Sequence, residues 1–163
     1  MMKFALAAAL AAAGISAGAA RAADYVTIEL KAPVDAPADA AWAKVSDFCA
    51  IGGWMKTTCT VTGGPGVGEV RLIAGRVSEV LVSNTARSYT YSQPKSPIDY
   101  HGTVEIRPDG PKTSTLIYTL VYDADALPKG PDGAPADKAK DKANRTAMFT
   151  RVLGVIKTQA EAK

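Results

Sequence analysis

The chain alternates between apolar and polar residues over most of its length, at a spacing typical of β-strands. The stretch DYVTIELKAPV alternates throughout and predicts a half-buried strand near the start of the chain. The following stretch, DAPADAAWAKVSDF, carries Trp42, Val45 and Phe48 at helical spacing, which predicts a helix packed through that face. A second short helix is expected to end at Gly52-Gly53.

Six more alternating segments follow, separated by turn residues and with no helical stretch between them. They are KTTCTVTG, GEVRLIA, RVSEVLVS, RSYTYSQ, YHGTVEIR and TSTLIYTLVYD. Strands without helices between them pair in antiparallel order, so these segments predict an antiparallel meander. The glycine cluster at residues 63–66 lacks the Gly-Lys-Ser/Thr ending of a phosphate-binding loop and precedes a strand. We interpret it as a chain reversal.

The end of the chain changes to helical spacing at about Lys138, after a long connection rich in Pro, Gly and Ala. A wheel of about 100° per residue gathers one group of side chains on a single face. They are Arg145, Met148, Phe149, Val152, Val155 and Ile156, with Leu153 at the margin. The only large partner for this face is the sheet. The sequence therefore predicts an α+β fold, in which a curved antiparallel sheet of seven strands wraps around a long C-terminal helix.

Two charged residues interrupt the apolar alternation of GEVRLIAGRVSEVL. If the hairpin turns through residues 74–76, Ile73 faces Val77 and Arg71 faces Glu79 across the two strands. Residues that face one another share one side of the sheet, so the two charges would form a pair there. A two-residue turn would shift the register by one and separate them.

Whether the Arg71–Glu79 pair is buried or solvated depends on the side of the sheet that it occupies. Val77 and Leu81 share its face, which is therefore the apolar, inward one. Leu72, Val80 and Val82 make the opposite face apolar too, so both placements stay open. A buried pair needs good hydrogen bonds to break even, and a partly wet ligand cavity is one setting where it survives. A solvated pair would contribute under about 1 kcal/mol.

The same alternation nominates further residues that face the predicted helix. They are Tyr89, Tyr91, Gln93, Tyr100, Val104, Leu116, Tyr118 and Leu120 from the strands, with Met148 and Val152 from the helix. Tyrosine rings with single hydroxyls suit a planar or sterol-like ligand with few polar groups, although they serve equally as core filling. His101 follows Tyr100 and is expected to face outward, without the nucleophile that a catalytic triad requires.

Residues 1–22 have the composition of a secretory signal peptide: a basic start, a short apolar run rich in alanine, and the small-residue ending ARA. We expect cleavage there, export to a bacterial periplasm or secretion, and one ligand-binding domain over residues 23–163. The apolar run is short for a membrane span, although an uncleaved anchor remains an alternative. Lys3 and Arg21 belong to this segment, and without them the formal net charge of +3 falls by two. A nearly neutral chain predicts no nucleic-acid partner and no stable membrane insertion.

The chain has two cysteines, Cys49 and Cys59, which export would place in an oxidising compartment. We expect a disulfide between them, worth about 2–4 kcal/mol; the alternative is two separate small buried side chains. Two cysteines and one histidine are too few for the usual metal-ligand clusters, so no metal and no other cofactor is expected.

The order of elements, together with AWAKVSDFCAIGGW, GPGVGEVRLI, VSEVLV, RSYTYS and YHGTVEI, resembles a known family. It is the polyketide cyclase/dehydrase and lipid-transport branch of the START-like, helix-grip superfamily (SRPBCC), which also holds pollen-allergen-type carriers. The resemblance covers nearly all of the mature chain. It implies an internal cavity for a small hydrophobic or amphipathic molecule, lined by Arg71 and Glu79. Lachrymatory factor synthases of this superfamily are held to use these two positions in catalysis.

Plant hormone receptors of the same superfamily differ from this chain in two respects. Their pocket lysine corresponds to Gly53 here, and their gating loop is longer than the turn in IAGRV. Both differences count against hormone-type sensing. We therefore expect an exported carrier of a lipid, polyketide or sterol-like ligand. One alternative is a cyclase, dehydratase or isomerase with Glu79 as base and Arg71 or a tyrosine as its electrostatic partner. Another is an envelope interaction protein without a ligand, and the oligomeric state stays open.

Overall fold

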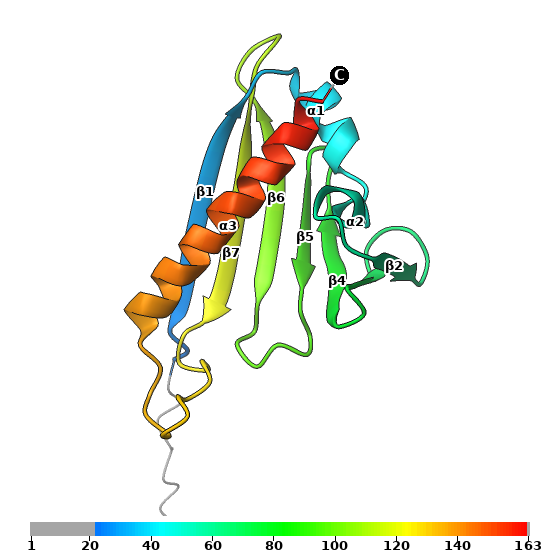
Figure 1. Ribbon diagram of the computed structural model, residues 1–163. Helices are drawn as coiled ribbons and strands as arrows, with labels where there is room; N and C mark the ends of the chain where they lie inside the picture. The colour runs from blue at the N-terminus through cyan, green and yellow to red at the C-terminus, as the bar shows by residue number, and fades with distance from the viewer. Residues whose placement is uncertain (1–21, 163) are drawn as a thin grey trace, which may run out of the picture.

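The structure is a computed structural model that describes residues 22–162, and it contains one sheet and three helices within them. The elements are β1 (Tyr25–Val34), α1 (Ala38–Val45), α2 (Ile51–Trp54), β2 (Cys59–Thr62), β3 (Val70–Ile73), β4 (Val77–Asn84), β5 (Ser88–Ser92), β6 (His101–Pro108), β7 (Ser114–Asp123) and α3 (Lys138–Ala160). Figure 1 shows α3 lying diagonally across one face of the sheet.

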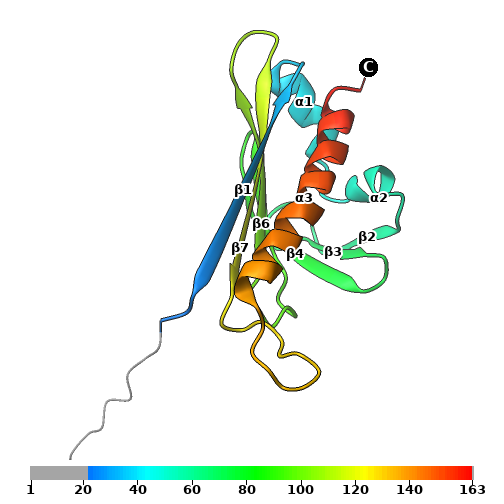
Figure 2. The same cartoon turned by 60° about the vertical axis from the view of Figure 1, so that its left-hand side comes forward.

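The sheet has seven strands in the order β1-β7-β6-β5-β4-β3-β2, and all neighbouring strands are antiparallel. In Figure 2 the sheet bends so that β3 and β4 come round toward the helix side. This arrangement confirms the α+β, helix-grip fold expected from the sequence, including two short helices after the first strand.

The two ends of the sheet differ in the length of their strands. At one end, β1 and β7 pair over ten residues and β6 pairs with β7 over eight. At the other end, the β2–β3 and β3–β4 ladders are four residues long each. Backbone hydrogen bonds alone therefore hold the β2–β4 end less firmly than the β1–β7 end.

The helix α3 begins with Asp137, whose carboxylate accepts a hydrogen bond from the backbone N–H of Lys140 and caps the first turn. Its buried residues are Leu153, Ile156 and Ala160, all in its C-terminal half, where it also meets α1. Leu153, expected at the margin of the apolar face, is only 5 % exposed. Met148, expected against the sheet, is 42 % exposed. A helical wheel averages over the whole helix, whereas a diagonal crossing buries a different part of the surface at each turn.

The predicted disulfide is present. Cys49, in the turn between α1 and α2, is bonded to Cys59 at the start of β2, with a Cα–Cα distance of 5.7 Å. Disulfides of this kind form and persist in oxidising compartments. The bond connects the helical segment to the edge strand of the short-stranded end.

The predicted signal peptide lies outside the described residues except for Ala22. Within residues 22–162, no helix is both long enough and apolar enough to cross a bilayer. The same part of the chain contains no group of three or more His, Cys, Asp or Glu side chains placed to hold a metal ion.

Candidate functional site

Arg71 and Glu79 face one another across β3 and β4, in the register that the three-residue turn predicted. Ile73 lies opposite Val77 at the end of the same ladder. The turn between them closes with a hydrogen bond from the Arg76 N–H to the Ile73 carbonyl oxygen, 3.1 Å. The two-residue turn and its shifted register are thereby excluded.

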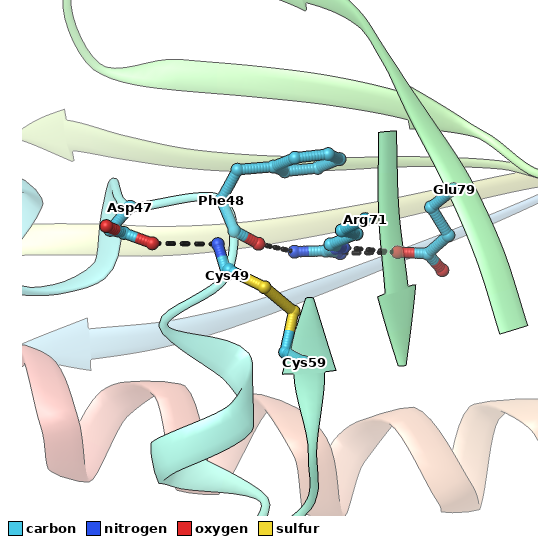
Figure 3. Close-up of a disulfide and its surroundings, with 6 residues drawn as sticks. All are labelled: Asp47, Phe48, Cys49, Cys59, Arg71 and Glu79. Carbon is cyan, nitrogen blue, oxygen red and sulfur yellow. Dashed lines mark hydrogen bonds and ion pairs between the residues drawn. A yellow bond between two sulfur atoms is a disulfide. The ribbon is translucent and has the colours of Figure 1, made fainter. Parts of the chain in front are cut away.

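The Arg71–Glu79 pair is buried: Arg71 is 2 % exposed and Glu79 is 4 % exposed. Arg71 Nε donates to Glu79 Oε2 at 2.7 Å, and its Nη1 donates to the carbonyl oxygen of Phe48 (Figure 3). Glu79 Oε1 accepts a hydrogen bond from Gln93 Nε2 at 2.8 Å. Both carboxylate oxygens are thus hydrogen-bonded, which is the condition under which a buried ion pair is tolerated.

Aromatic rings surround the guanidinium of Arg71. Its Cζ lies 4.1 Å from the ring centroid of Phe48, 4.9 Å from that of Tyr91 and 5.8 Å from that of Tyr89, within the range of cation–π contacts. Burial works to lower the pKa of Arg71, but the carboxylate of Glu79 and the two tyrosines outweigh it, so the pKa of Arg71 is raised. The guanidinium therefore stays charged inside the protein.

The position of Phe48 depends on the disulfide next to it. Cys49 follows Phe48 directly, and its partner Cys59 lies opposite Ile73 in the β2–β3 ladder. Asp47 Oδ1 accepts a hydrogen bond from the backbone N–H of Cys49 at 2.8 Å. Figure 3 shows these constraints together: the disulfide and Asp47 hold the segment whose carbonyl oxygen contacts Arg71.

A row of five aromatic rings crosses the space between the sheet and α3. The ring centroids follow one another at 5.7 Å from Phe48 to Tyr89, 6.4 Å to Tyr91, 6.1 Å to Tyr100 and 6.2 Å to Phe149. Such spacings are typical of packed aromatic pairs. The row therefore fills the centre of the predicted cavity with side chains.

The tyrosine hydroxyls in this row bond to one another. The hydroxyl of Tyr91 lies 2.5 Å from that of Tyr118 and 3.4 Å from that of Tyr100. Burial raises the pKa of Tyr91 and of Tyr118 well above the usual value, so both hydroxyls stay protonated. The ring of Tyr91 lies over Gly102, its partner in the β5–β6 ladder, where a Cβ atom would come within 2.4 Å of the ring.

One pocket opens at the Phe149 end of the row, and we call it the α3 pocket. It has a volume of about 330 Å³ and lies between α3 and the connections over residues 93–100 and 124–137. Its lining residues are Gln93, Ser96, Pro97, Ile98, Tyr100, Pro128, Arg145, Met148 and Phe149. Among the described residues that line it, Arg145 is the one with a charge. Its Nε donates to Asp141 Oδ2 at 2.7 Å, and its Cζ lies 4.6 Å from the ring centroid of Tyr122.

A second pocket lies at the Phe48 end of the row, beside the disulfide, and we call it the disulfide pocket. Its volume is about 370 Å³. Its lining residues are Ser46, Asp47, Phe48, Cys49, Val61, Pro65, Gly66, Glu69, Leu81, Asn84 and Tyr89. The two pockets share no lining residue, so the aromatic row separates them.

The predicted ligand-binding residues are distributed over both pockets and the core between them. Tyr100 and Met148 line the α3 pocket, and Leu81 and Tyr89 line the disulfide pocket. The others line neither pocket: Tyr91, Val104, Leu116 and Tyr118 are buried in the core with Arg71 and Glu79, and Ile73, Val77 and Val152 are half-buried. His101 is on the surface as expected, with its Nε2 3.1 Å from Asp99 Oδ1.

Sequence reasoning missed two residues that shape this region. Phe48 was identified only as part of a helical face, yet it supplies both a carbonyl oxygen and a ring to Arg71. Its position next to Cys49 was the available signal, because a disulfide fixes the backbone of its neighbours. Arg145 was assigned to the helix face that meets the sheet, and nothing in its spacing indicates a pocket.

Residues 25–161 match the model of the family described as polyketide cyclase / dehydrase and lipid transport. No curated protein matches the sequence closely enough to count as a relative.

Several solved structures are similar in fold. A protein from Thermobifida fusca solved by NMR is 22 % identical, with a TM-score of 0.65 over 82 % of this chain and 92 % of that one. The Zhui aromatase/cyclase from a Streptomyces species is 20 % identical, with a TM-score of 0.66 over 84 % of this chain and 94 % of that one. Norcoclaurine synthase from Thalictrum flavum, solved with dopamine and hydroxybenzaldehyde, is 13 % identical, with a TM-score of 0.62 over 83 % and 86 %. At these identities the likeness concerns the fold.

Proposed function

Because the chain belongs to the polyketide cyclase/dehydrase and lipid transport family, we propose that it is an exported binding protein for a small amphipathic ligand. The α3 pocket is the proposed site. The observation that carries this proposal is the pocket itself, which lies between α3 and the connections over residues 93–100 and 124–137.

The lining of the α3 pocket suits a ligand with an apolar body and a few polar oxygen atoms. Ile98, Met148 and Phe149 offer apolar surface, while Arg145 and Gln93 offer hydrogen-bond donors. Binding sites of this kind are mostly apolar with a few placed polar groups. A volume of about 330 Å³ lies at the small end of the usual range for ligand pockets, which favours a compact ligand over a large lipid.

A cyclase or dehydratase role for the Arg71–Glu79 pair has less support. Glu79 is buried, and both of its carboxylate oxygens are engaged by protein donors: Oε2 accepts from Arg71 and Oε1 accepts from Gln93. Neither residue lines the α3 pocket, and Gln93 stands between that pocket and the carboxylate. We assign the pair to holding β3 and β4 against the Phe48 segment.

The binding proposal is tested with N-phenylnaphthylamine, a neutral apolar dye that fluoresces when it leaves water. Met148→Glu places a charge at the wall of the α3 pocket without disturbing the core, because Met148 is already exposed. We expect the dye affinity to fall about tenfold or more, as desolvating a charge next to an apolar ligand is costly.

The matched control is Met55→Glu, since Met55 is equally exposed and lines neither pocket. We expect its dye affinity to equal that of the unmodified protein. Equal affinity in both variants, or no binding of the dye at all, would contradict the proposal. Native mass spectrometry of the exported protein, followed by extraction, then identifies any ligand that co-purifies.

Export is tested separately by sequencing the N-terminus of the mature protein. The predicted signal segment leads us to expect a mature chain that begins at about residue 23 and is recovered from the periplasm or the medium. The Cys49–Cys59 disulfide supports this compartment. A cytoplasmic protein that retains residues 1–22 would contradict the export part of the proposal and leave the dye experiment unaffected.

A further inference from the structure

The disulfide pocket differs from the α3 pocket in the charge of its lining residues and in the bonds that hold their segments in place. We infer that it is a second binding site, specific for a small organic cation: an amine or ammonium group carried on a short apolar or aromatic body. This inference does not depend on the proposed function of the α3 pocket, because the two pockets have no residue in common.

The floor of the disulfide pocket is apolar and rigid. Phe48, Leu81 and Tyr89 all belong to the buried core, so a ligand body that contacts them leaves water for a preformed surface. Phe48 and Tyr89 also contact the guanidinium of Arg71 by cation–π interaction. Val61 and Pro65 extend the apolar surface toward the rim.

The charges at the rim are all negative. Asp47 and Glu69 line the pocket together with the neutral Ser46 and Asn84, and no lysine, arginine or histidine among residues 22–162 lines it. Neither carboxylate has a cationic partner within the described part of the chain. The charge of Arg71 beneath the floor is compensated by Glu79. The electrostatic field of the two rim carboxylates therefore favours a cation.

Both rim carboxylates belong to segments that other bonds hold in place. Asp47 Oδ1 accepts from the Cys49 N–H at 2.8 Å. The backbone N–H of Glu69 donates to the Gly66 carbonyl oxygen at 2.9 Å, and its own carbonyl oxygen accepts from the Leu81 N–H at 2.8 Å. The glycine-rich turn that forms one rim is thus tied to β4. A site fixed in this way loses little entropy when a ligand binds.

The number of carboxylates in the disulfide pocket indicates the class of ligand. A divalent metal ion needs several oxygen ligands converging on one point, and the described residues contain no group of three or more that could supply them. Two carboxylates at the rim of an apolar floor instead match a molecule with one charged end and one apolar end. The volume of about 370 Å³ accommodates a single aromatic ring with a short aminoalkyl chain.

The experiment compares three molecules of one shape and different charge: benzylamine, benzyl alcohol and benzoate. Binding is followed by the amide shifts in nitrogen–proton NMR spectra of the oxidised protein. We expect benzylamine to bind most tightly and to shift the amides of Cys49, Glu69 and Asn84. Benzyl alcohol is expected to bind more weakly, and benzoate weakest of all.

Two conservative variants test the rim carboxylates, and a third is the matched control. We expect Asp47→Asn and Glu69→Gln each to lower the affinity for benzylamine about two- to fivefold, the range for exposed charge pairs. Asp35→Asn makes the same change of charge at an exposed position outside both pockets and should leave the affinity unchanged. The NMR spectrum of each variant reports directly whether it is folded.

Four results would overturn the inference. They are equal binding of benzylamine and benzyl alcohol, equal affinity in Glu69→Gln and Asp35→Asn, shifts confined to Tyr100 and Phe149 in the α3 pocket, and no shifts at about 10 mM benzylamine. Reduction of the disulfide is a further test of the inference. It should abolish binding of benzylamine, because Cys49 forms part of the wall, and leave the binding of N-phenylnaphthylamine in place.

Discussion

The structure at the two ends of the aromatic row is stabilised by different kinds of contact. At the Phe149 end, the ring of Phe149 packs against Tyr118 of β7, and β7 pairs with β1 over ten residues and with β6 over eight. At the Phe48 end, the disulfide pocket is lined in part by Val61 of β2 and by Leu81 and Asn84 of β4, and the β2–β3 and β3–β4 ladders have four residues each. Each backbone hydrogen bond contributes only about 1 kcal/mol net, so short ladders need support from other contacts.

That support at the Phe48 end consists of one covalent bond and one buried ion pair. The disulfide ties the α1–α2 turn to β2, and Arg71 joins β3 both to β4 through Glu79 and to the turn through the Phe48 carbonyl oxygen. Within residues 22–162, the Phe149 end contains no disulfide and no ion pair with both partners fully buried. From the comparison of the two ends we infer that interior charge and a cross-link replace strand length at this sheet edge.

The largest effect is expected from removing one member of the ion pair. Glu79→Leu leaves the guanidinium of Arg71 buried without its counter-ion, and such changes cost about 3–5 kcal/mol. The free energy of unfolding, measured with urea, should fall by that amount. The double variant Arg71→Leu/Glu79→Leu should lose much less than the two single variants together, since it removes both charges.

The control for this prediction is Glu29→Leu, which removes the partner of Lys31 in an exposed pair of β1. Exposed pairs contribute little because water screens them, so its stability should stay close to that of the unmodified protein. If Glu79→Leu changed stability no more than Glu29→Leu does, the ion pair would not be what holds the short-stranded end.

The second effect concerns the disulfide. Cys49→Ser/Cys59→Ser removes a short cross-link and should cost about 2–4 kcal/mol. Because the bond joins only the α1–α2 turn and β2, hydrogen exchange should quicken most at residues 47–62 and on β3. The amides of β1, β7 and α3 should change least. An equal loss of protection at both ends would contradict the prediction that the disulfide acts mainly on the short-stranded end.

Much of this organisation follows from the sequence by simple rules. The pairing of Arg71 opposite Glu79 could be predicted because it depends only on strand alternation and on the length of one turn. The disulfide could be predicted because the chain has no other cysteines from which to choose. The order of strands and helices resembled one family closely enough to give the fold.

The filled centre and the two separate pockets could not be predicted in the same way. Alternation indicates which side of the sheet a tyrosine faces, but it does not indicate how far its ring extends over the neighbouring strand. Tyr91 lies across the sheet because Gly102 opposite it has no side chain. The disulfide pocket is formed by segments around Asp47 and Glu69, which come together only after the sheet has bent.

The smallest effect is expected from Gly102→Ala, in the middle of the row where the two ends meet. A methyl group there would overlap the ring of Tyr91, whose hydroxyl is bonded to that of Tyr118, so the ring must shift within a packed core. Overpacking of this kind costs about 1–3 kcal/mol.

The matched control is Gly154→Ala on α3, where a Cβ atom meets nothing within 4 Å and helix propensity should add up to about 1 kcal/mol. Opposite signs of the two changes in urea unfolding would confirm that the row is packed solid. Two stabilising changes would mean that Tyr91 has room to move, and that the two pockets can open into one.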